Sequence, residues 1–538
     1  MEGLMQRLPL SIPMIVRHAE RMHSRKTVTT RTDDGVKVAT FAQVLERARR
    51  LATALRSIGV GPDDRVATFC ANHQEHLEAY VAVPSMGSIL HTLNIRLFDK
   101  DLAHIVEHAQ DSVVIVDKTL WPAWEKVASR VSCVRCTIVV DDATGSGPDN
   151  TLDYEALLAE ATPSGFDEDI PEHQAAALCY TSGTTGLPKG VLYSHRSNVL
   201  HSMTVCLSGS LGLHESDVVL ALVPMFHANA WGLPYACLMA GADLVMAGRH
   251  TAPEILTGLL VQHQVTFAAG VPTIWQGMLQ SMTRAKGQLG KLERILCGGS
   301  AVPLGLQQAY HREVGVRLIQ GWGMTESSPI ASLSFPLRAH DGLAPPELDG
   351  VLNSQGRPPL GVEVRLVDEA GKLLPWDGRS VGEILLRGNW VASGYYLDAA
   401  PEKFSDGWLR TGDVASIDPD GYIRICDRIK DLVKSGGEWI SSVQIETSLM
   451  SHPDIVEAAV VAVAHPRWGE RPLACVVPRA DAKGRLSKDI LLDYLRPLVA
   501  KWWLPDDIIF LDQLPRTSVG KFDKKALRER FKDHPLPS

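Results

Sequence analysis

The chain has 538 residues, of which 45% are hydrophobic and 22% are charged, and its net charge is −8. At the usual domain size of about 150 residues this length allows two to four domains. The mildly acidic balance, with no long basic run, excludes nucleic acid as an expected partner.

The cysteines and the apolar runs indicate the environment of the chain. Nine cysteines show no disulfide framework, and the close pair Cys133 and Cys136 lies beside an apolar run, so we predict free thiols and a cytoplasmic setting. The most membrane-like run, 218–242, is broken by prolines and polar residues. We therefore predict buried core there and no membrane span.

Helical and strand patterns alternate over residues 38–140 and again from 175 to 320. The first stretch predicts a helix at 41–58, a strand at 65–70, a helix at 76–86 and a strand at 112–116. The second predicts strands at 218–223, 242–247, 266–269, 294–297 and 317–320, with helices that begin at Pro253, Pro272 and Pro303. Such alternation predicts an α/β fold of parallel sheets covered by helices, with ligands beyond the carboxyl ends of the strands.

The pattern changes near Gly350. Short strands at 362–367, 382–387 and 421–426 predict a small distorted β-barrel or a distorted sheet at about 350–425. After Asp427 comes a compact α+β unit, with a helix from Val443, strands at 456–463 and 474–478, and a helix at 488–499. We therefore expect a large N-terminal domain at 1–429 and a small C-terminal domain at 430–538.

The loop YTSGTTGLPKG at 180–190, here called the phosphate loop, has the clearest chemical character. It lies between apolar runs at 175–179 and 191–193 that predict strands. Hydroxyl residues alternating with glycine present backbone N–H groups, hydroxyls and the Lys189 ammonium to a polyanion. The loop is not a Walker motif, because Pro188 stands where the second glycine is needed. A flexible hairpin tip is the structural alternative.

Four further strings follow predicted strands. In PMFHANAWG (224–232), His227 and Trp231 could line an apolar pocket, although a lone histidine is more often a core residue. GGSAVP (298–303) would let a flat ring approach the backbone. In GWGMTE (321–326), Glu326 is a natural Mg²⁺ ligand beside phosphates. In WLRTGD (408–413), Asp413 could accept two hydrogen bonds from ribose, although Asp after Gly is commonly a turn residue.

These strings, with PRTSVGK at 515–521, resemble the motifs of the adenylate-forming (AMP-binding) superfamily. The resemblance covers about residues 40 to 530. PMFHANAWGLPY and DRIKDLVKSGGEWISS look most similar to medium- and long-chain fatty acyl-CoA synthetases, a branch that includes 3-methylmercaptopropionate-CoA ligases. The family implies that a carboxylic acid attacks ATP to give acyl-AMP and pyrophosphate, and that coenzyme A then takes the acyl group. ATP, Mg²⁺ and coenzyme A are the implied cofactors, and an aliphatic acid of short, medium or long chain is the implied substrate.

The resemblance also implies a role for each motif. The implied catalytic residues are Lys521, Glu326, His227 and Thr184, of which Glu326 and Thr184 hold the metal. The implied nucleotide and coenzyme A contacts are Thr181, Ser182, Gly183, Thr185, Gly186, Lys189, Gly299, Ser300, Ala301, Trp322, Gly323, Met324, Thr325, Asp413, Arg428, Gly437 and Trp468. The acyl group is expected against His227, Trp231, Gly299 and Gly323, and Lys430 is the expected hinge of a mobile C-terminal domain.

One position departs from the common family pattern. Trp322 stands where tyrosine is commoner, and we expect its ring to preserve the stacking on adenine. Two other functions stay open: an adenylation enzyme that loads a carrier protein, and a nucleotide-binding regulator without catalysis. The joint presence of Glu326, Asp413, Arg428 and Lys521 argues against the regulator. A homodimer is expected because relatives frequently form one.

Overall fold

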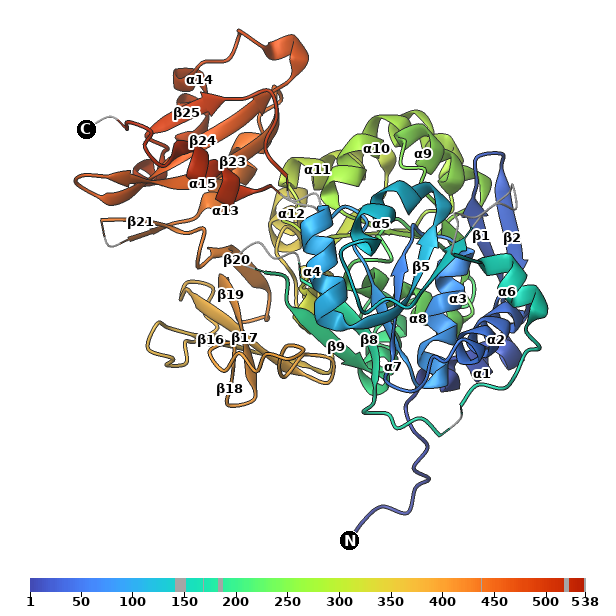
Figure 1. The fold of residues 1–538 in the computed structure, drawn as a ribbon. Coiled ribbons are helices and arrows are strands. Elements are labelled where there is room, and N and C mark those ends of the chain that lie inside the picture. Colours follow the sequence, from blue (N-terminus) through green and yellow to red (C-terminus); the bar gives the residue numbers. More distant parts are fainter. Residues whose placement is uncertain (141–150, 168, 182–186, 437, 517–521, 537–538) are drawn as a thin grey trace.

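The computed structural model describes residues 1–140, 151–167, 169–181, 187–436, 438–516 and 522–536. Two large sheets form the N-terminal part, and the C-terminal part lies apart from them (Figure 1). The eight-stranded sheet has the order β15 (Ile330–Leu333), β14 (Leu318–Gly323), β13 (Arg294–Gly298), β12 (Phe267–Gly270), β10 (Val218–Ala221), β11 (Asp243–Met246), β1 (Thr27–Arg31) and β2 (Val36–Thr40). Its strands are parallel except β15 and β2, which pair antiparallel at the two edges.

The second large sheet has seven strands. Their order is β7 (Leu152–Asp153), β6 (Cys136–Val140), β5 (Asp111–Asp117), β3 (Arg65–Phe69), β4 (Ile89–Thr92), β8 (Ala175–Tyr180) and β9 (Gly190–Ser194). All neighbours are parallel except β8 and β9, the two strands that flank the phosphate loop. The predicted strands on either side of this loop are therefore confirmed.

Helices cover both faces of each large sheet, because central strands such as β10, β12, β5 and β8 alternate buried side chains between two apolar clusters. The core between the sheets takes in α1 (Ile12–Met22), α2 (Phe41–Ser57), α3 (Gln74–Ala82), α7 (His195–Cys206) and α8 (Leu233–Ala240). On the outer face of the eight-stranded sheet lie α9 (Pro253–Gln262), α10 (Pro272–Arg284) and α11 (Leu304–Ala309). On the outer face of the seven-stranded sheet lie α4 (Asp99–Ala109) and α5 (Trp121–Ala128), while α6 (Tyr154–Glu160) packs on α2 and α12 is Pro345–Leu352.

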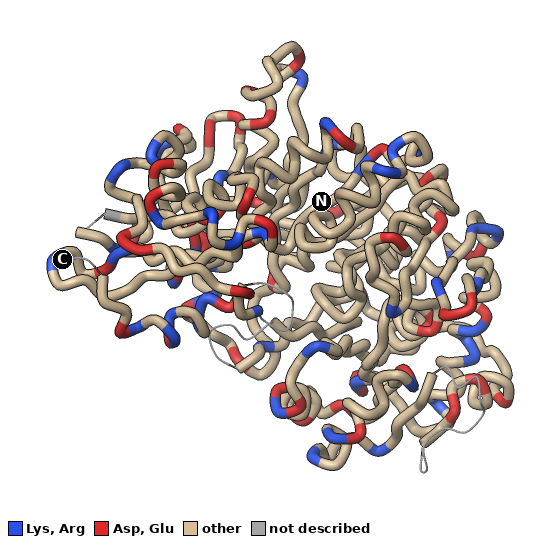
Figure 2. Tube along the Cα trace, turned by 90° about the horizontal axis from the view of Figure 1, so that it is seen from above, with Lys and Arg blue, Asp and Glu red and all other residues tan. Residues whose placement is uncertain are grey.

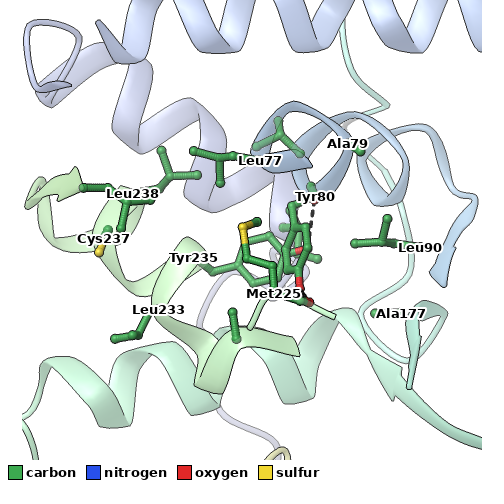
Figure 3. Close-up of a cluster of buried hydrophobic side chains, with 14 of the residues drawn as sticks. Leu77, Ala79, Tyr80, Leu90, Ala177, Met225, Leu233, Tyr235, Cys237 and Leu238 are labelled. Atoms are coloured by element: carbon green, nitrogen blue, oxygen red, sulfur yellow. Dashed lines mark hydrogen bonds between the residues drawn. The ribbon is translucent and has the colours of Figure 1, made fainter. Parts of the chain in front are cut away.

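Part of this core anchors a loop of functional interest (Figure 3). Tyr80 on α3 donates its hydroxyl hydrogen to the carbonyl oxygen of Met225, and Tyr235 on α8 donates to the carbonyl oxygen of Tyr80 at 2.8 Å. Both rings are fully buried, so each hydroxyl needs such a partner. The segment that carries Phe226 and His227 is thereby held against helices of both large sheets.

A third sheet follows at 362–428. Its antiparallel strands are β16 (Val362–Val367), β17 (Gly382–Gly388), β19 (Trp408–Ile417), β18 (Phe404–Ser405) and β20 (Ile423–Arg428). Bulges interrupt the β17–β19 and β19–β20 ladders, so of the two predicted forms the pairing described for these strands gives the distorted sheet. The bulged strands carry Asp413 and Arg428 to the edge of the large sheets.

The C-terminal part is an α+β unit. Its sheet contains β22 (Glu438–Ile440), β21 (Val433–Ser435), β24 (Gly469–Pro478), β23 (Ile455–His465) and β25 (Asp507–Phe510), all antiparallel except the β24–β25 pair. Three helices pack against it: α13 (Ser442–Met450), α14 (Lys488–Leu495) and α15 (Lys524–Phe531). The predicted helix 488–499 was too long, since α14 ends at Leu495, two residues before Pro497, which has no N–H to donate.

Charged residues of both signs are interspersed along the chain (Figure 2). All nine cysteines lie in the described ranges and are free thiols, as predicted. Among the helices of the described ranges, none is both long and apolar enough to cross a bilayer.

Candidate active site

Segments that follow strands of both large sheets line one cavity of about 900 Å³. The eight-stranded sheet contributes the segments after β10, β13 and β14, and the seven-stranded sheet contributes the hairpin between β8 and β9. Residues of the third sheet, including 410–412 and 428–430, complete the lining. The carboxyl ends of parallel strands are where such sheets bind ligands, and the volume suits a small-molecule site.

The two ends of the phosphate loop are tied together. Thr181 N donates to Lys189 O at 2.9 Å, and Lys189 N donates to Thr181 Oγ1 at 3.0 Å. The hydroxyl of Tyr180, the last residue of β8, is hydrogen-bonded to His108 Nδ1 at 2.6 Å. These bonds fix where the loop leaves and re-enters the sheet, so Thr181 and Lys189 both face the cavity.

Lys189 has two partners on the segment that follows β17. Its Nζ lies 3.0 Å from Asp398 Oδ2 and 4.8 Å from the centroid of the Tyr395 ring. The ion pair is partly exposed, so it contributes little to stability and a stronger anion can displace Asp398. The ring face of Tyr395 favours a cation at this place whichever anion is present.

Glu326 is buried at the wall of the same cavity. Its Oε1 accepts a hydrogen bond from the Tyr395 hydroxyl at 2.6 Å, and its carbonyl oxygen accepts one from Ala392 N at 2.7 Å. Burial and the neighbouring Glu326 both raise the pKa of Tyr395, so the hydroxyl stays a donor. A carboxylate held by a neutral donor beside a polyanion loop fits Mg²⁺, which takes one or two carboxylates together with phosphate oxygens.

A left-handed turn follows His227. Ala228, Asn229, Ala230 and Trp231 have φ of 37°, 39°, 56° and 55°. L-residues with a β-carbon occupy this region at a cost of about 1 kcal/mol each. The turn directs the Trp231 indole toward β13, where the ring would lie 3.3 Å from a β-carbon added to Gly298 and 3.8 Å from one added to Gly299. Trp231 therefore forms a wall of the cavity.

The glycines of the two strings after β13 and β14 are required by close backbone approach. A β-carbon on Gly323 would lie 1.7 Å from Pro329 O, and one on Gly298 would lie 2.8 Å from Gly321 O. Gly299 has φ of 87°, which favours glycine directly. These glycines therefore make room for neighbouring backbone and, at Gly298 and Gly299, for the Trp231 ring. The approach of a flat ring to this backbone remains a prediction.

Asp413, Arg428 and Trp322 form a hydrogen-bonded group. Asp413 and Arg428 are paired in the β19–β20 ladder, with Arg428 Nε 3.0 Å from Asp413 Oδ1. Trp322 Nε1 donates to Asp413 Oδ2 at 3.0 Å. Asp413 raises the pKa of Arg428, so the guanidinium stays protonated. The group lines a second cavity of about 270 Å³, which adjoins the first at Gly299, Trp322 and Gly323 and also contains Ser300 and Ala301.

Lys430 lies at the end of the third sheet and lines both cavities. Burial lowers its pKa. Immediately around it, contacts join the third sheet to the C-terminal unit: Ser442 N donates to Asp427 Oδ2 at 2.5 Å, and Ser441 Oγ donates to Cys426 O. Lys430 therefore lies at the junction between the third sheet and the C-terminal unit. The resemblance implies a hinge at this position, and the hinge remains a prediction.

The structure brings most of the predicted site residues to the two cavities. The larger cavity contains Thr181, Lys189, His227, Trp231, Gly299, Trp322, Gly323, Met324, Thr325, Glu326, Arg428 and Lys430, and the smaller one adds Ser300, Ala301 and Asp413. Ser182, Gly183, Thr184, Thr185, Gly186, Gly437 and Lys521 lie outside the described residues. Trp468 lines neither cavity: it is 41% exposed, beside Gly436 in the C-terminal unit, with the Arg467 guanidinium 4.6 Å from its ring.

Among the residues of the larger cavity that were not expected from the sequence, two contact predicted site residues. Tyr395 and Asp398 belong to the string GYYLD at 394–398, in which no spacing indicates chemistry. Their contacts with Glu326 and Lys189 join residues 69 and 209 positions apart. The one sequence signal was a tyrosine pair after a Gly-containing loop, which is too common to select them.

Another polar cluster lies away from these cavities. Cys70, His73 and Asp117 have ligand atoms within 4.8 Å of one another. His73 Nε2 lies 2.6 Å from Asp117 Oδ1, and burial raises the pKa of the Cys70 thiol. The thiol therefore stays protonated and the imidazole is occupied by the carboxylate, which describes a buried ion pair that joins β3, β5 and α3 better than a metal site.

Comparison with known proteins covers nearly the whole chain. Residues 16–396 match the family model described as AMP-binding enzyme, and residues 444–521 match the one described as AMP-binding enzyme C-terminal domain. The chain is 42% identical to a medium-chain-fatty-acid–CoA ligase of Ectopseudomonas oleovorans, over 99% of this chain and 98% of that protein. It is 42% identical to a 3-methylmercaptopropionyl-CoA ligase of Ruegeria pomeroyi (99% of both chains) and 45% identical to a long-chain-fatty-acid–CoA ligase of Thermus thermophilus (96% and 94%).

Solved structures share the same fold. The crystal structure of ATP-bound MatB from Rhodopseudomonas palustris has a TM-score of 0.84 at 27% identity, over 97% of this chain and 99% of that one.

Proposed function

The chain belongs to the family of AMP-binding enzymes, and from that premise we propose that it activates an aliphatic monocarboxylic acid and transfers the acyl group to coenzyme A. It is an acid–thiol ligase of the AMP-forming type, as its relatives named CoA ligases are. What the proposal adds is the class of acid and the role of each residue at the two cavities.

The observation that carries the proposed acid is the apolar end of the larger cavity. Five of its lining residues belong to the core cluster between the large sheets: Ala228, Trp231, Leu296, Ile330 and Leu333. Burying an alkyl chain there gains about 0.8 kcal/mol per methylene. A second carboxylate at this end would lose its hydration without a cationic partner among these five residues.

The cationic and hydroxyl groups supply the other half of the site. Thr181 and Lys189 support a triphosphate position beside the phosphate loop, and Glu326 supports a metal position. Asp413 and Arg428 suit ribose, and the Trp322 ring, which lines both cavities, suits adenine. His227 lines the same cavity, and we assign it to the acid's carboxylate.

In the first half-reaction, a carboxylate oxygen of the acid forms a bond to the α-phosphorus of ATP while the bond to the β-phosphate oxygen breaks. Pyrophosphate leaves with the electron pair. Two anions must meet, so the barrier falls when cationic groups face the developing charge. Lys189 would face the leaving pyrophosphate, and Lys521, outside the described residues, would face the α-phosphate as the sequence predicts.

Glu326 and, as the resemblance implies, Thr184 would hold Mg²⁺, which would neutralise phosphate charge and orient the leaving group. Glu326 is suited to this because the Tyr395 hydroxyl fixes one carboxylate oxygen and leaves the other available to the cavity.

In the second half-reaction, the thiol sulfur of coenzyme A attacks the acyl carbon, the bond between that carbon and the AMP oxygen breaks, and the thiol proton is released. Pyrophosphate must leave and a long pantetheine arm must enter, which favours a movement of the C-terminal unit about Lys430. Gly437 and Trp468 are the residues that we assign to coenzyme A. A homodimer and a cytoplasmic location also remain predictions from the sequence.

A panel of acids tests the proposal. Purified enzyme is given MgATP, free coenzyme A and linear acids from acetate to palmitate, together with 3-methylmercaptopropionate and the dicarboxylate succinate, and AMP release is measured. We expect acid-dependent AMP release that requires coenzyme A and is highest with one group of aliphatic monocarboxylates. A preference for succinate would overturn the assignment of the acid.

A second arm separates the alternatives. Replacing coenzyme A with a phosphopantetheinyl carrier protein should abolish turnover. Activity with the carrier protein alone would make the chain a carrier-loading enzyme, and binding of ATP without acid-dependent pyrophosphate release would make it a regulator.

A further inference from the structure

Trp322 makes a polar contact that stacking on adenine does not require. Its indole Nε1 donates to Asp413 Oδ2 at 3.0 Å, across 91 positions of sequence. Trp322 is on β14 of the eight-stranded sheet and Asp413 is on β19 of the third sheet. The hydrogen bond therefore joins the proposed adenine wall to the proposed ribose anchor. A phenol in the place of the indole would present its donor at a different position.

The Asp413 carboxylate is held from two opposite sides. Arg428 Nε lies 3.0 Å from Oδ1, while the indole holds Oδ2. The backbone N–H of Asp413 donates to Thr411 Oγ1 at 3.0 Å, and the carboxylate is only 4% exposed. A buried carboxylate with a donor on each oxygen cannot rotate freely about its last torsion. Each oxygen still has acceptor capacity left for a further donor.

Without the indole, the carboxylate would have a different preferred orientation. An arginine beside a carboxylate favours a bidentate arrangement, in which both oxygens face the guanidinium. The Trp322 hydrogen bond opposes that rotation, because it keeps Oδ2 on the side of β14. Trp322 and Asp413 line the smaller cavity together with Arg428, Ser300 and Ala301, so an Oδ2 that the indole holds stays at the wall of this cavity.

We propose that Trp322 is a positioning residue for ribose recognition: its indole N–H orients the Asp413 carboxylate so that both oxygens accept hydrogen bonds from the vicinal hydroxyls of the nucleotide sugar. This inference rests on the proposed function, because it requires AMP or ATP in the smaller cavity. It assigns to tryptophan a second task beyond contact with the base, and it makes sugar selectivity depend on a residue that does not belong to the sugar anchor itself.

The test compares two nucleotides in two proteins by calorimetry. AMP carries both sugar hydroxyls, and 2′,3′-dideoxyadenosine monophosphate carries neither. The variant Trp322→Phe keeps an aromatic face for the base and removes the N–H. We expect the wild type to prefer AMP at least tenfold, and Trp322→Phe to lose about three- to tenfold in AMP affinity, the scale of one hydrogen bond. Affinity for the dideoxy nucleotide should change less than twofold.

Other outcomes contradict the inference in distinguishable ways. An equal loss of affinity for both nucleotides would reduce Trp322 to a stacking residue, and unchanged affinity for both would remove any role of the indole N–H. If the wild type bound neither nucleotide, the proposed function would fail as well.

A double-mutant comparison protects the test against misfolding. In an Asp413→Asn background, whose thermal unfolding is checked first, adding Trp322→Phe should cause no further loss of AMP affinity, because the two residues act through one carboxylate. Additive losses from the two substitutions would contradict the proposed coupling.

Discussion

The Tyr395 hydroxyl donates a 2.6 Å hydrogen bond to Glu326 Oε1. The same tyrosine ring lies 4.8 Å from Lys189 Nζ, so one side chain contacts both the proposed metal ligand and the cation of the phosphate loop. Backbone bonds reinforce the arrangement, since Ala392 N donates to Glu326 O and Tyr396 N donates to Gly190 O, each at 2.7 Å. The segment 392–398 therefore holds the phosphate loop and the turn at Thr325 and Glu326 at a fixed separation.

Replacing Tyr395 with phenylalanine tests this arrangement. The ring beside Lys189 is kept, but the Glu326 carboxylate loses its donor and can rotate away from the metal position. We expect the apparent KM for MgATP in acid-dependent pyrophosphate exchange to rise about tenfold, the scale of a hydrogen bond to a charged group. The magnesium concentration at half-maximal exchange should rise with it. Tyr494→Phe, which removes a hydroxyl paired with Ser451 on the C-terminal unit, should leave both values unchanged.

Mn²⁺ binding gives an independent measurement. Electron paramagnetic resonance of free Mn²⁺ in the presence of a non-hydrolysable ATP analogue should show weaker metal binding by Tyr395→Phe than by the wild type. Equal metal affinity in the two proteins would mean that Tyr395 does not orient Glu326.

Trp231 is expected to limit the length of the acyl chain. Its indole lies against Gly298 and Gly299 at the apolar end of the larger cavity. Trp231→Gly removes this wall and suits the left-handed φ of 55° at the position. In the acid panel, the acid with the highest kcat/KM should become longer by several carbons, while Trp231→Phe should give a smaller shift. An optimum that stays at the same chain length in both variants would show that another residue closes the pocket.

Lys430 is expected to affect the two half-reactions differently. Proline at this position fixes φ and restricts Ile429, so a rotation about residue 430 becomes costly. We expect Lys430→Pro to slow acyl transfer to coenzyme A at least tenfold while adenylation changes by no more than about threefold. Lys430→Ala removes the side chain but keeps the backbone free, and should slow neither step by more than a few-fold. Equal losses in both half-reactions of Lys430→Pro would eliminate the hinge.

Two buried histidines should make folding stability depend on pH. Burial lowers the pKa of His195 to about 4 and of His201 to about 3. Each ring accepts a backbone N–H, from Ile12 at 3.2 Å and from Ile330 at 3.4 Å, which a protonated ring could not do. Both imidazoles are therefore neutral in the folded protein at pH values where the unfolded chain already binds protons.

The direction in which the free energy of unfolding changes with pH follows from these pKa values. Below about pH 6.5 these two histidines bind protons in the unfolded chain but stay neutral in the folded protein until about pH 4. Together they lower the free energy of unfolding by up to about 2.7 kcal/mol for each unit by which the pH falls. In His201→Gln, the dependence of the free energy of unfolding on pH should be weaker by about 1.4 kcal/mol per pH unit, the contribution of one proton. His173→Gln, which changes an exposed side chain, should leave it unchanged. Identical slopes in the wild type and His201→Gln between pH 6.5 and 4.5 would contradict the assignment.

Local sequence patterns were sufficient for the parts of the fold that local physics determines. The strands on both sides of the phosphate loop, and helix starts at Pro253 and Pro272, follow from apolar periodicity and from proline at the first helical turn. Helix α3 was misplaced by two residues at its start, because His73 acts as its N-cap and histidine is not among the usual capping residues.

Predicting the residues that line the cavity required the family resemblance as well as the local sequence pattern. Motif residues such as Glu326 and Asp413 were found because their strings are specific to a family. Tyr395, Asp398 and the Trp322–Asp413 bond were not found, since each depends on contacts between segments that are distant in the sequence and meet only in the folded protein. No local periodicity encodes which of two tyrosines faces a carboxylate across 69 residues.

The account depends on a carboxylate oxygen attacking the α-phosphorus of ATP. If it does, that oxygen becomes the bridge of the acyl-adenylate and stays with phosphorus when the thiol attacks the acyl carbon. The most direct measurement is mass spectrometry of AMP formed from an acid labelled with ¹⁸O in its carboxylate, with MgATP and coenzyme A. We expect one ¹⁸O atom in each AMP molecule. AMP without the label, at full conversion of the acid to its thioester, would contradict the account.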